Sequence, residues 1–283
     1  STAPQPASSR AGNGLDAVQP GSAGQTEADA WATQIEALRS AQRVRDGRRL
    51  QAERTLPGRE IGTGMRLVET QFQLPTAIAS DTMLQVPPWE ADAETAGHTL
   101  LYLDTETTGL AGGSGTLVFL LGLAWQADAT LHVQQWLLTS PGAEREWLAA
   151  INAALPPRPL LVSFNGKSFD LPLLATRHRL ARHADPFAHA PHWDLMHPLR
   201  RAFEPRWPNC RLQTAEKRLL GIERVDDLPG SFAPQAYTSF LRHGDSAMLA
   251  EAIRHNRDDV VSLARLLPAV GQFGEHRVDR LEL

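Results

Sequence analysis

The sequence predicts a mixed α/β fold from residue 98 onward, and three observations support this. First, apolar runs of strand length follow one another with short connections, which is typical of an antiparallel meander. Second, a helical pattern comes next, at about 142–155, and is followed by a fourth apolar run. Third, a helix between two strands favours a right-handed crossover, so the fourth strand should run parallel to its neighbour. The expected strands are 100–103, 116–125, 130–138 and 160–164.

Composition bounds the class of protein. With 283 residues and 42% hydrophobic content, the chain can build one sizeable core with appendages. No apolar run approaches the length of a membrane span, and no signal peptide is expected, so we expect a soluble, cytoplasmic protein that does not bind a membrane. The single cysteine, Cys210, excludes an intrachain disulfide and leaves too little sulfur for a structural zinc site. We expect it to be a small packing residue.

The pattern along the chain predicts four regions. Residues 1–57 comprise a tail with the composition of a disordered segment, up to about residue 26, and then a basic helix. Residues 58–97 hold a small β appendage, with short strands at 66–72 and 83–86, and a linker. Residues 98–270 form the main domain, whose last part is mainly helical, and 271–283 form a C-terminal tail.

The basic helix at 27–54 has two readings. Trp31, Ile35 and Leu38 share one face, followed by six arginines against two acids. It is either a solvated helix that docks on the main domain through its tryptophan face or an arm that contacts nucleic acid.

Two acids end the first strand of the main domain. Side chains alternate along a strand, so Asp104 and Glu106 would project from the same face. Two carboxylates held side by side repel each other unless a divalent cation neutralises them. An Asp-x-Glu spacing alone is weak evidence, because a chain of this length contains about one by chance. The second copy, Asp92 and Glu94, lies in a polar, proline-rich run and is expected to be solvated surface.

Asp170 lies in the first turn of a predicted helix that follows the fourth strand. One interpretation of Asp170 is purely structural, because the helix dipole favours an acidic side chain in the first turn of any helix. The preceding Gly166-Lys167-Ser168 is not a phosphate-binding loop, because Leu161 stands where that motif needs a glycine.

The last helix, at about 246–267, carries His255 and Asp259 at the margin of its apolar stripe. Alone, these two residues would be a pair bridging along the helix. Together with Asp104, Glu106 and Asp170, however, Asp259 would complete a site for two Mg²⁺ or Mn²⁺ ions about 4 Å apart. Such ions generate hydroxide from water and stabilise an in-line phosphoryl displacement. His255 would be the general base, since histidine titrates near neutrality.

This pattern resembles the DEDD (DnaQ-like) exonucleases of the ribonuclease-H-like superfamily, over about 100–267. The resemblance implies that Asp104-Thr105-Glu106 is the first motif, that Asp170 is the second-motif aspartate and that Asp259 is the last. In the His subtype the histidine stands five residues before the last aspartate, and in the Tyr subtype a tyrosine stands four before it. Here His255 occupies the four-residue spacing.

A closer likeness is to the YprB-like branch of the superfamily. The motifs that carry it are Cys210-Arg211-Leu212-Gln213-Thr214-Ala215-Glu216, Asp226-Asp227-Leu228-Pro229-Gly230, His255-Asn256 and Asp259-Val260. The likeness implies a five-stranded mixed sheet flanked by helices. It also implies that 192–195 forms the fifth strand, with Asp194 supporting the site without holding a metal.

The expected function is a metal-dependent nuclease, most simply a 3′-5′ exonuclease on single-stranded DNA or RNA. The alternatives are a non-catalytic nucleic-acid-binding or scaffold module on the same fold and a structure-specific endonuclease. Four acids facing phosphates argue against a pure binder. Residues 177–218 carry nine positive and four negative side chains, a net charge of +5 in a protein of net charge −4. This basic region either holds a phosphate backbone or is scattered over solvated helix faces.

Overall fold

The computed structural model describes residues 23–73, 97–109, 115–204, 206–224 and 230–272, with side chains from residue 33 onward. Several sequence predictions lie outside these residues. They are the tail up to residue 22, the Trp31 side chain, the strand at 83–86 and the linker after it, Asp92 and Glu94, Asp226 and Asp227, and the C-terminal tail from residue 273.

The chain divides into two compact units, residues 1–46 and 47–283. The described part of the first unit consists of helix α1 (Ala23–Glu53), whose last turns belong to the second unit. In these last turns Ala52 is buried, and Thr139 donates a 2.6 Å hydrogen bond to Glu53. Among the described residues, no helix combines the length and apolar character that a membrane crossing needs.

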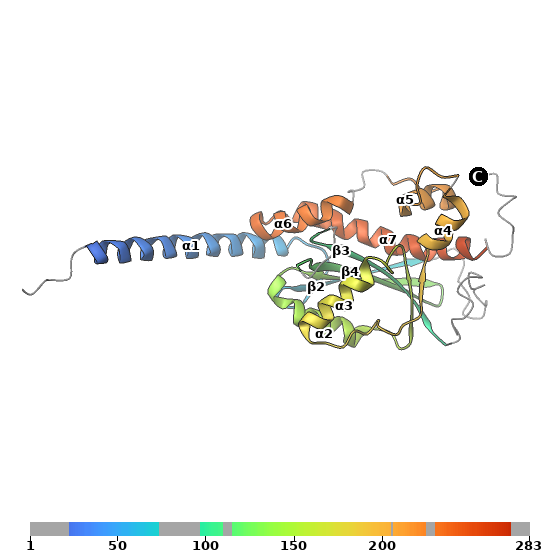
Figure 1. The fold of residues 1–283 in the computed structure, drawn as a ribbon, viewed down its shortest axis with the longest axis horizontal. Helices are drawn as coiled ribbons and strands as arrows, with labels where there is room; N and C mark the ends of the chain where they lie inside the picture. The colour runs from blue at the N-terminus through green and yellow to red at the C-terminus, as the bar shows by residue number, and fades with distance from the viewer. Residues whose placement is uncertain (1–22, 74–96, 110–114, 205, 225–229, 273–283) are drawn as a thin grey trace, which may run out of the picture. The chain divides into compact units, whose positions relative to one another are not determined.

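One mixed sheet organises the second unit (Figure 1). Its strand order is β1-β2-β5-β4-β3-β6-β7. The meander predicted from sequence is confirmed, because β3, β4 and β5 pair antiparallel in that order. The predicted crossover is also confirmed, since β6 pairs parallel to β3 and β7 parallel to β6. The strands are β1 (Arg59–Gly62), β2 (Met65–Gln73), β3 (Thr99–Thr107), β4 (Val118–Ala127), β5 (Thr130–Leu138), β6 (Pro159–Ser163) and β7 (His192–Asp194).

The sheet has seven strands, two more than the five expected. The expected five are present as β5, β4, β3, β6 and β7. Of the other two, β2 was expected at 66–72 in a small β appendage together with a strand at 83–86, and β1 was not expected. Instead, all nine residues of β2 pair with β5, so the hairpin extends the same sheet. The physical reason is burial, because Met65, Leu67 and Val68 of β2 join the core.

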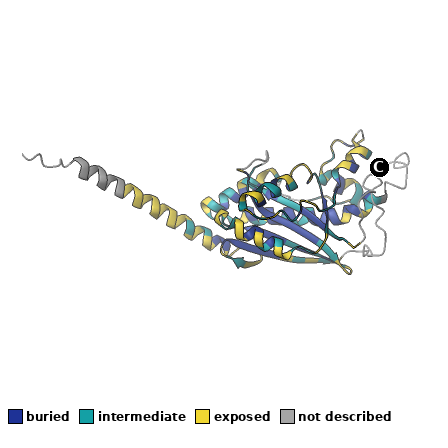
Figure 2. Ribbon diagram, turned by 60° about the horizontal axis from the view of Figure 1, so that its bottom comes forward, coloured by how far each residue is buried: buried dark blue, intermediate teal, exposed yellow. Residues whose placement is uncertain are grey.

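Alternation along β3 separates two helical layers. Tyr102 packs in a cluster with α4 and the second half of α7, whereas Leu101 and Leu103 pack in another with α2 and α3. A third cluster joins β4 and β5 to α6 and the first half of α7. Figure 2 shows the strands largely buried between these helices. The helices are α2 (Glu144–Ala154), α3 (Asp170–Ala181), α4 (Met196–Phe203), α5 (Leu212–Ala215), α6 (Ala233–His243) and α7 (Ser246–Gln272).

Candidate metal centre

The C-terminal end of β3 has one open edge. On the side of β6, pairing stops at Tyr102, which lies opposite Val162. On the other side, β4 continues to pair with β3 through Thr107. The backbone from Asp104 to Thr107 therefore offers a free edge, and this is where the chain returns from β6.

The turn after β6 brings Asp170 to that edge. The turn is tight, because Asn165 has φ +68° and a side chain on Gly166 would collide with the Ser163 hydroxyl. Asp194, at the end of β7, holds the turn by accepting the backbone N–H groups of Asn165 (2.7 Å) and Lys167 (3.0 Å). Asp194 thus supports the loop that leads to Asp170, which is the supporting place expected for it.

Thr105 joins Asp170 to β3. Its side chain has the parity of Leu101 and Leu103, on the α3 side of the sheet, and its hydroxyl donates to Asp170 Oδ1. Burial raises the pKa of Asp170 to about 6, against the lowering effect of this hydrogen bond.

Asp104 has the opposite parity and meets α7. Asn256 of α7 donates to Asp104 Oδ2 at 2.8 Å and to the Asp104 carbonyl oxygen at 3.2 Å. Gln135 of β5 donates to Asn256 Oδ1 at 2.9 Å, which fixes the orientation of the Asn256 amide. Gly122 of β4 makes room, because a Cβ there would collide with the same amide. Two successive hydrogen bonds, from Gln135 of β5 to Asn256 of α7 and from Asn256 to Asp104 of β3, therefore orient Asp104.

The charges of the other three predicted carboxylates act on Asp104. Burial is the largest cause that raises the pKa of Asp104 well above its usual range, and the charges of Asp259, Asp170 and Glu106 raise it further. The hydrogen bond from Asn256 opposes them. The structure thus brings together the acids of β3, α3 and α7 that sequence singled out.

Asp259 is held by an arginine that sequence analysis did not single out. Arg224 Nη2 lies 2.5 Å from Asp259 Oδ1, and the same guanidinium binds Glu216 through two nitrogen atoms. Burial raises the pKa of Asp259, whereas the charges of His255 and Arg224 lower it. Glu216 is only 1% exposed, so the Arg224 guanidinium binds a buried acid and Asp259 at the same time.

His255 lies between Arg224 and Asp259. Its Nδ1 is 3.4 Å from Arg224 Nη1, and its Nε2 is 3.6 Å from Asp259 Oδ2. Both contacts are long for hydrogen bonds, so neither fixes the tautomer. Nε2 lies near Gly230, since a Cβ added there would be 3.4 Å from it, and Gly230 lines the cleft described next.

A cleft of about 920 Å³ opens over the end of β3. It is lined by Asp104, Glu106 and Asp170, together with residues of the loops after β3 and β6, Arg211 and the start of α6. Asp259 and His255 are not among its described lining residues. Among the described residues, no three acidic, histidine or cysteine side chains are preassembled as a metal cage. The donor set nevertheless fits a hard divalent cation, because crowded carboxylate oxygens with raised pKa values are stabilised by added positive charge.

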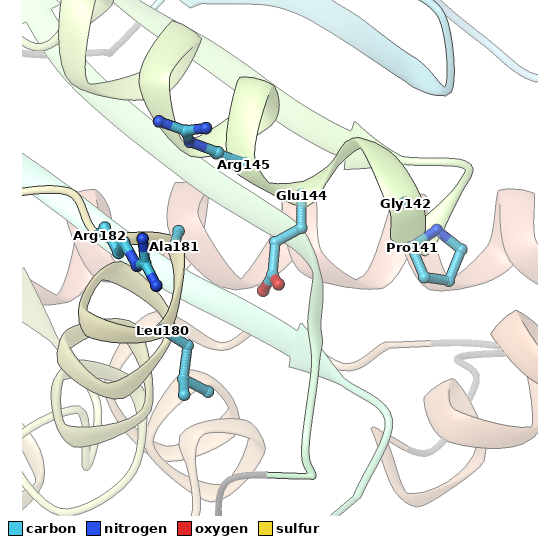
Figure 3. A pocket seen from close by; sticks show the side chains of 7 residues that line it. All are labelled: Pro141, Gly142, Glu144, Arg145, Leu180, Ala181 and Arg182. Atoms are coloured by element: carbon cyan, nitrogen blue, oxygen red, sulfur yellow. The ribbon is translucent and has the colours of Figure 1, made fainter.

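A second hollow lies between the start of α2 and the end of α3 (Figure 3). It is lined by Pro141, Gly142, Glu144, Arg145, Leu180, Ala181 and Arg182. Its one carboxylate, Glu144, is bound to Arg177 at 2.5 Å. Its lining therefore lacks the grouped acids of the cleft at β3.

Sequence analysis missed the residues that position the acids. Asn256 and Glu216 stood within motifs of the YprB-like resemblance, but without a role. No sequence pattern marked Gln135 or Arg224, because Asn256 lies 121 residues from Gln135 and Asp259 lies 35 residues from Arg224 along the chain.

More than half of the chain matches a known protein family. The model of the RNase H superfamily matches residues 101–270. An uncharacterized protein of Bacillus subtilis (strain 168), YprB, is 38% identical over 174 residues, which are 60% of this chain and 41% of YprB. The chain thus spans less than half the length of this relative.

Two solved structures show weaker likeness. A product-bound exonuclease I is 19% identical with a TM-score of 0.36, over 51% of this chain and 43% of that one. The family B DNA polymerase of Pyrobaculum calidifontis is 17% identical with a TM-score of 0.43, over 62% of this chain and 25% of that one.

Proposed function

We propose that this chain, which belongs to the RNase H superfamily, is a metal-dependent nuclease, and specifically a 3′-5′ exonuclease on single-stranded DNA or RNA. The observation that supports the proposal is the environment of Asp104. This half-buried carboxylate is oriented by Asn256, and it is repelled by the charges of Glu106 on the same strand, Asp170 of α3 and Asp259 of α7. A protein that only bound nucleic acid would gain nothing from this concentration of negative charge facing a polyanion.

Asp104, Glu106, Asp170 and Asp259 would hold two Mg²⁺ or Mn²⁺ ions. When bound, such ions activate a water molecule and stabilise the charge that develops on the phosphate. The residues of the chain contribute orientation: Asn256 fixes Asp104, Thr105 fixes Asp170, and Arg224 fixes Asp259.

His255 is the proposed proton acceptor. It lies beside Asp259, and its Nε2 lies near Gly230, which lines the cleft. A base in this position would accept the proton of the attacking water on the lone pair of one ring nitrogen.

Cleavage of end-labelled single strands tests the proposal. DNA and RNA of the same sequence are incubated with Mn²⁺ and the wild type, Asp259→Asn or Asp258→Asn. Asp258 is the matched control, because it directly precedes Asp259 on α7 but pairs with Arg257 and Arg254 instead. We expect a ladder that shortens from the 3′ end, lost in Asp259→Asn and kept in Asp258→Asn.

Other outcomes separate the alternatives. Cutting of a circular single strand would replace the exonuclease by an endonuclease, since a circle has no end. Absence of cleavage by a folded wild type that binds strands equally in EDTA and Mn²⁺ would replace the nuclease by a binding module.

A further inference from the structure

The cleft over the end of β3 carries a marked imbalance of charge. Three carboxylates line it, and among its described lining residues Arg211 is the one cation. Arg211 is exposed, and its guanidinium makes no contact within the described part of the chain that would occupy it. A nucleic-acid strand entering this cleft would therefore meet three carboxylates and one guanidinium among the described lining residues.

The other cations of the basic region lie elsewhere. Arg177 binds Glu144, Arg200 binds Glu204 at 3.0 Å, and Lys217 binds Glu223 at 2.6 Å. Arg182 lines the separate hollow of Figure 3. None of the eight positive residues that accompany Arg211 in 177–218 is part of the described lining of the acidic cleft. The net charge of +5 counted over residues 177–218 is therefore not the charge of the cleft. Arg211 is the one positive residue of that region in the described lining.

The position of Arg211 is fixed relative to the acids. Its backbone N–H donates to Asn209 Oδ1 at 3.1 Å, and its carbonyl oxygen accepts the first hydrogen bonds of α5 from Thr214 and Ala215. Directly after α5 comes Glu216, which binds Arg224 and, through it, Asp259. The segment that carries Arg211 is therefore tied to the carboxylates by a buried ion pair.

We propose that Arg211 binds a phosphate group of the nucleic-acid strand in the cleft, a phosphate other than the one at the metal ions. This inference rests on the proposed function. Arginine suits the task, because its planar fork donates two hydrogen bonds to one phosphate and stays charged at any physiological pH. The contact would also offset part of the repulsion between the strand and the carboxylates.

Strand binding tests Arg211 without relying on catalysis. Binding of a labelled single strand of about 12 nucleotides is followed by fluorescence anisotropy at several salt concentrations, with Mn²⁺, on an Asp104→Asn background that prevents cleavage. Arg211→Gln is compared with Arg218→Gln, which removes an equal charge from an exposed residue of the same segment outside the cleft lining.

We expect Arg211→Gln to weaken binding about ten-fold and to reduce the slope of log K against log salt by about 0.7, the value for one phosphate contact on a single strand. Arg218→Gln should change neither quantity. Arg211→Lys should keep the slope and recover part of the affinity, because it keeps the charge but loses the fork. In the cleaving enzyme, Arg211→Gln should raise KM and leave kcat nearly unchanged.

Equal effects of Arg211→Gln and Arg218→Gln, or no effect of either, would overturn the inference. The proposed function fails separately. If the wild type binds strands through Arg211 but never cleaves them, the phosphate contact stands and the nuclease does not. If it cleaves them with an unchanged KM in Arg211→Gln, the nuclease stands and the contact does not.

Discussion

At the scale of single residues, burial controls the protonation of the candidate metal ligands. Asp170 is the clearest case, because its folded-state pKa of about 6 exceeds the ordinary value of 3.8. The folded protein therefore holds this proton more tightly than the unfolded chain does. The free energy of unfolding of the metal-free protein should fall as pH rises from about 4 through about 6, since an acid with a raised pKa contributes stability that is lost when it ionises.

The variant Asp170→Asn tests this pH dependence, because it cannot ionise and still accepts the hydrogen bond from Thr105. In EDTA, we expect it to be more stable than the wild type at pH 7.5, by at most about 3 kcal/mol, and close to it at pH 4. Thermal or urea unfolding across this pH range measures the difference. Identical pH dependence in both proteins would show that Asp170 does not carry the effect.

The same scale shows what sequence can predict about a site. Asp104 and Glu106 follow an apolar strand, and Asp259 borders a helical stripe, so local periodicity identifies them. Arg224 is different, because its role comes from Glu216 and Asp259, and no pattern along the chain marks that geometry. A residue whose function depends on long-range ion pairs is found only once the fold is known.

At the scale of elements, the contact between α7 and the sheet orients Asp104 at the end of β3. Asn256 is fully buried, donates to Asp104 and accepts from Gln135, so Asn256→Ala removes a hydrogen bond from each of them, and Gln135 keeps its bond to the Ile253 carbonyl oxygen. We expect a loss of about 1–3 kcal/mol in stability and a several-fold weaker affinity for Mn²⁺, measured as free Mn²⁺ by electron paramagnetic resonance.

A matched amide elsewhere separates the two effects. Asn152 of α2 accepts from His178 Nε2 at 3.0 Å, away from the cleft lining. Asn152→Ala should destabilise the protein without changing Mn²⁺ affinity. Equal loss of Mn²⁺ affinity in both variants would mean that Asn256 acts only through general stability.

A second element contact joins α2 to α3. Glu144 and Arg177 form a largely buried pair, with 15% and 12% of their side chains exposed, and Arg177 also donates to the Thr116 carbonyl oxygen at 3.3 Å. Glu144→Gln should cost about 3 kcal/mol in urea unfolding, because it leaves a buried guanidinium without its counter-charge. Glu223→Gln, which breaks the exposed pair with Lys217, should have no measurable effect. A similar small effect for both would show that solvent screens the Glu144 pair.

At the scale of the whole molecule, the family and the five central strands were predictable, and the edge of the sheet was not. Four of the central strands are apolar runs that the sequence pattern identifies, whereas the fifth, β7, was implied by the resemblance to the YprB-like branch. The sequence of β2 also reads as a strand, but its pairing with β5 joins residues 65 and 138, and no local signal selects that edge. The pairing of β2 with β5 is favoured because it buries Met65, Leu67 and Val68 in the core.

Metal binding should stabilise the whole molecule. Because the crowded carboxylates disfavour the metal-free fold and hold the ions only when folded, Mn²⁺ at 100 times its dissociation constant should add about 2.7 kcal/mol of stability. For a domain of this size that corresponds to a rise in Tm of about 5–10 °C, measured by differential scanning calorimetry at pH 7.5 against EDTA. In Asp104→Asn the Tm values in EDTA and in Mn²⁺ should converge. The Tm in EDTA should be higher than that of the wild type, because a carboxylate repelled by three others is gone, and the rise on adding Mn²⁺ should be smaller, because a ligand is gone. A full Mn²⁺ response in this variant would place the cation away from Asp104, and with it the chemistry proposed for the end of β3.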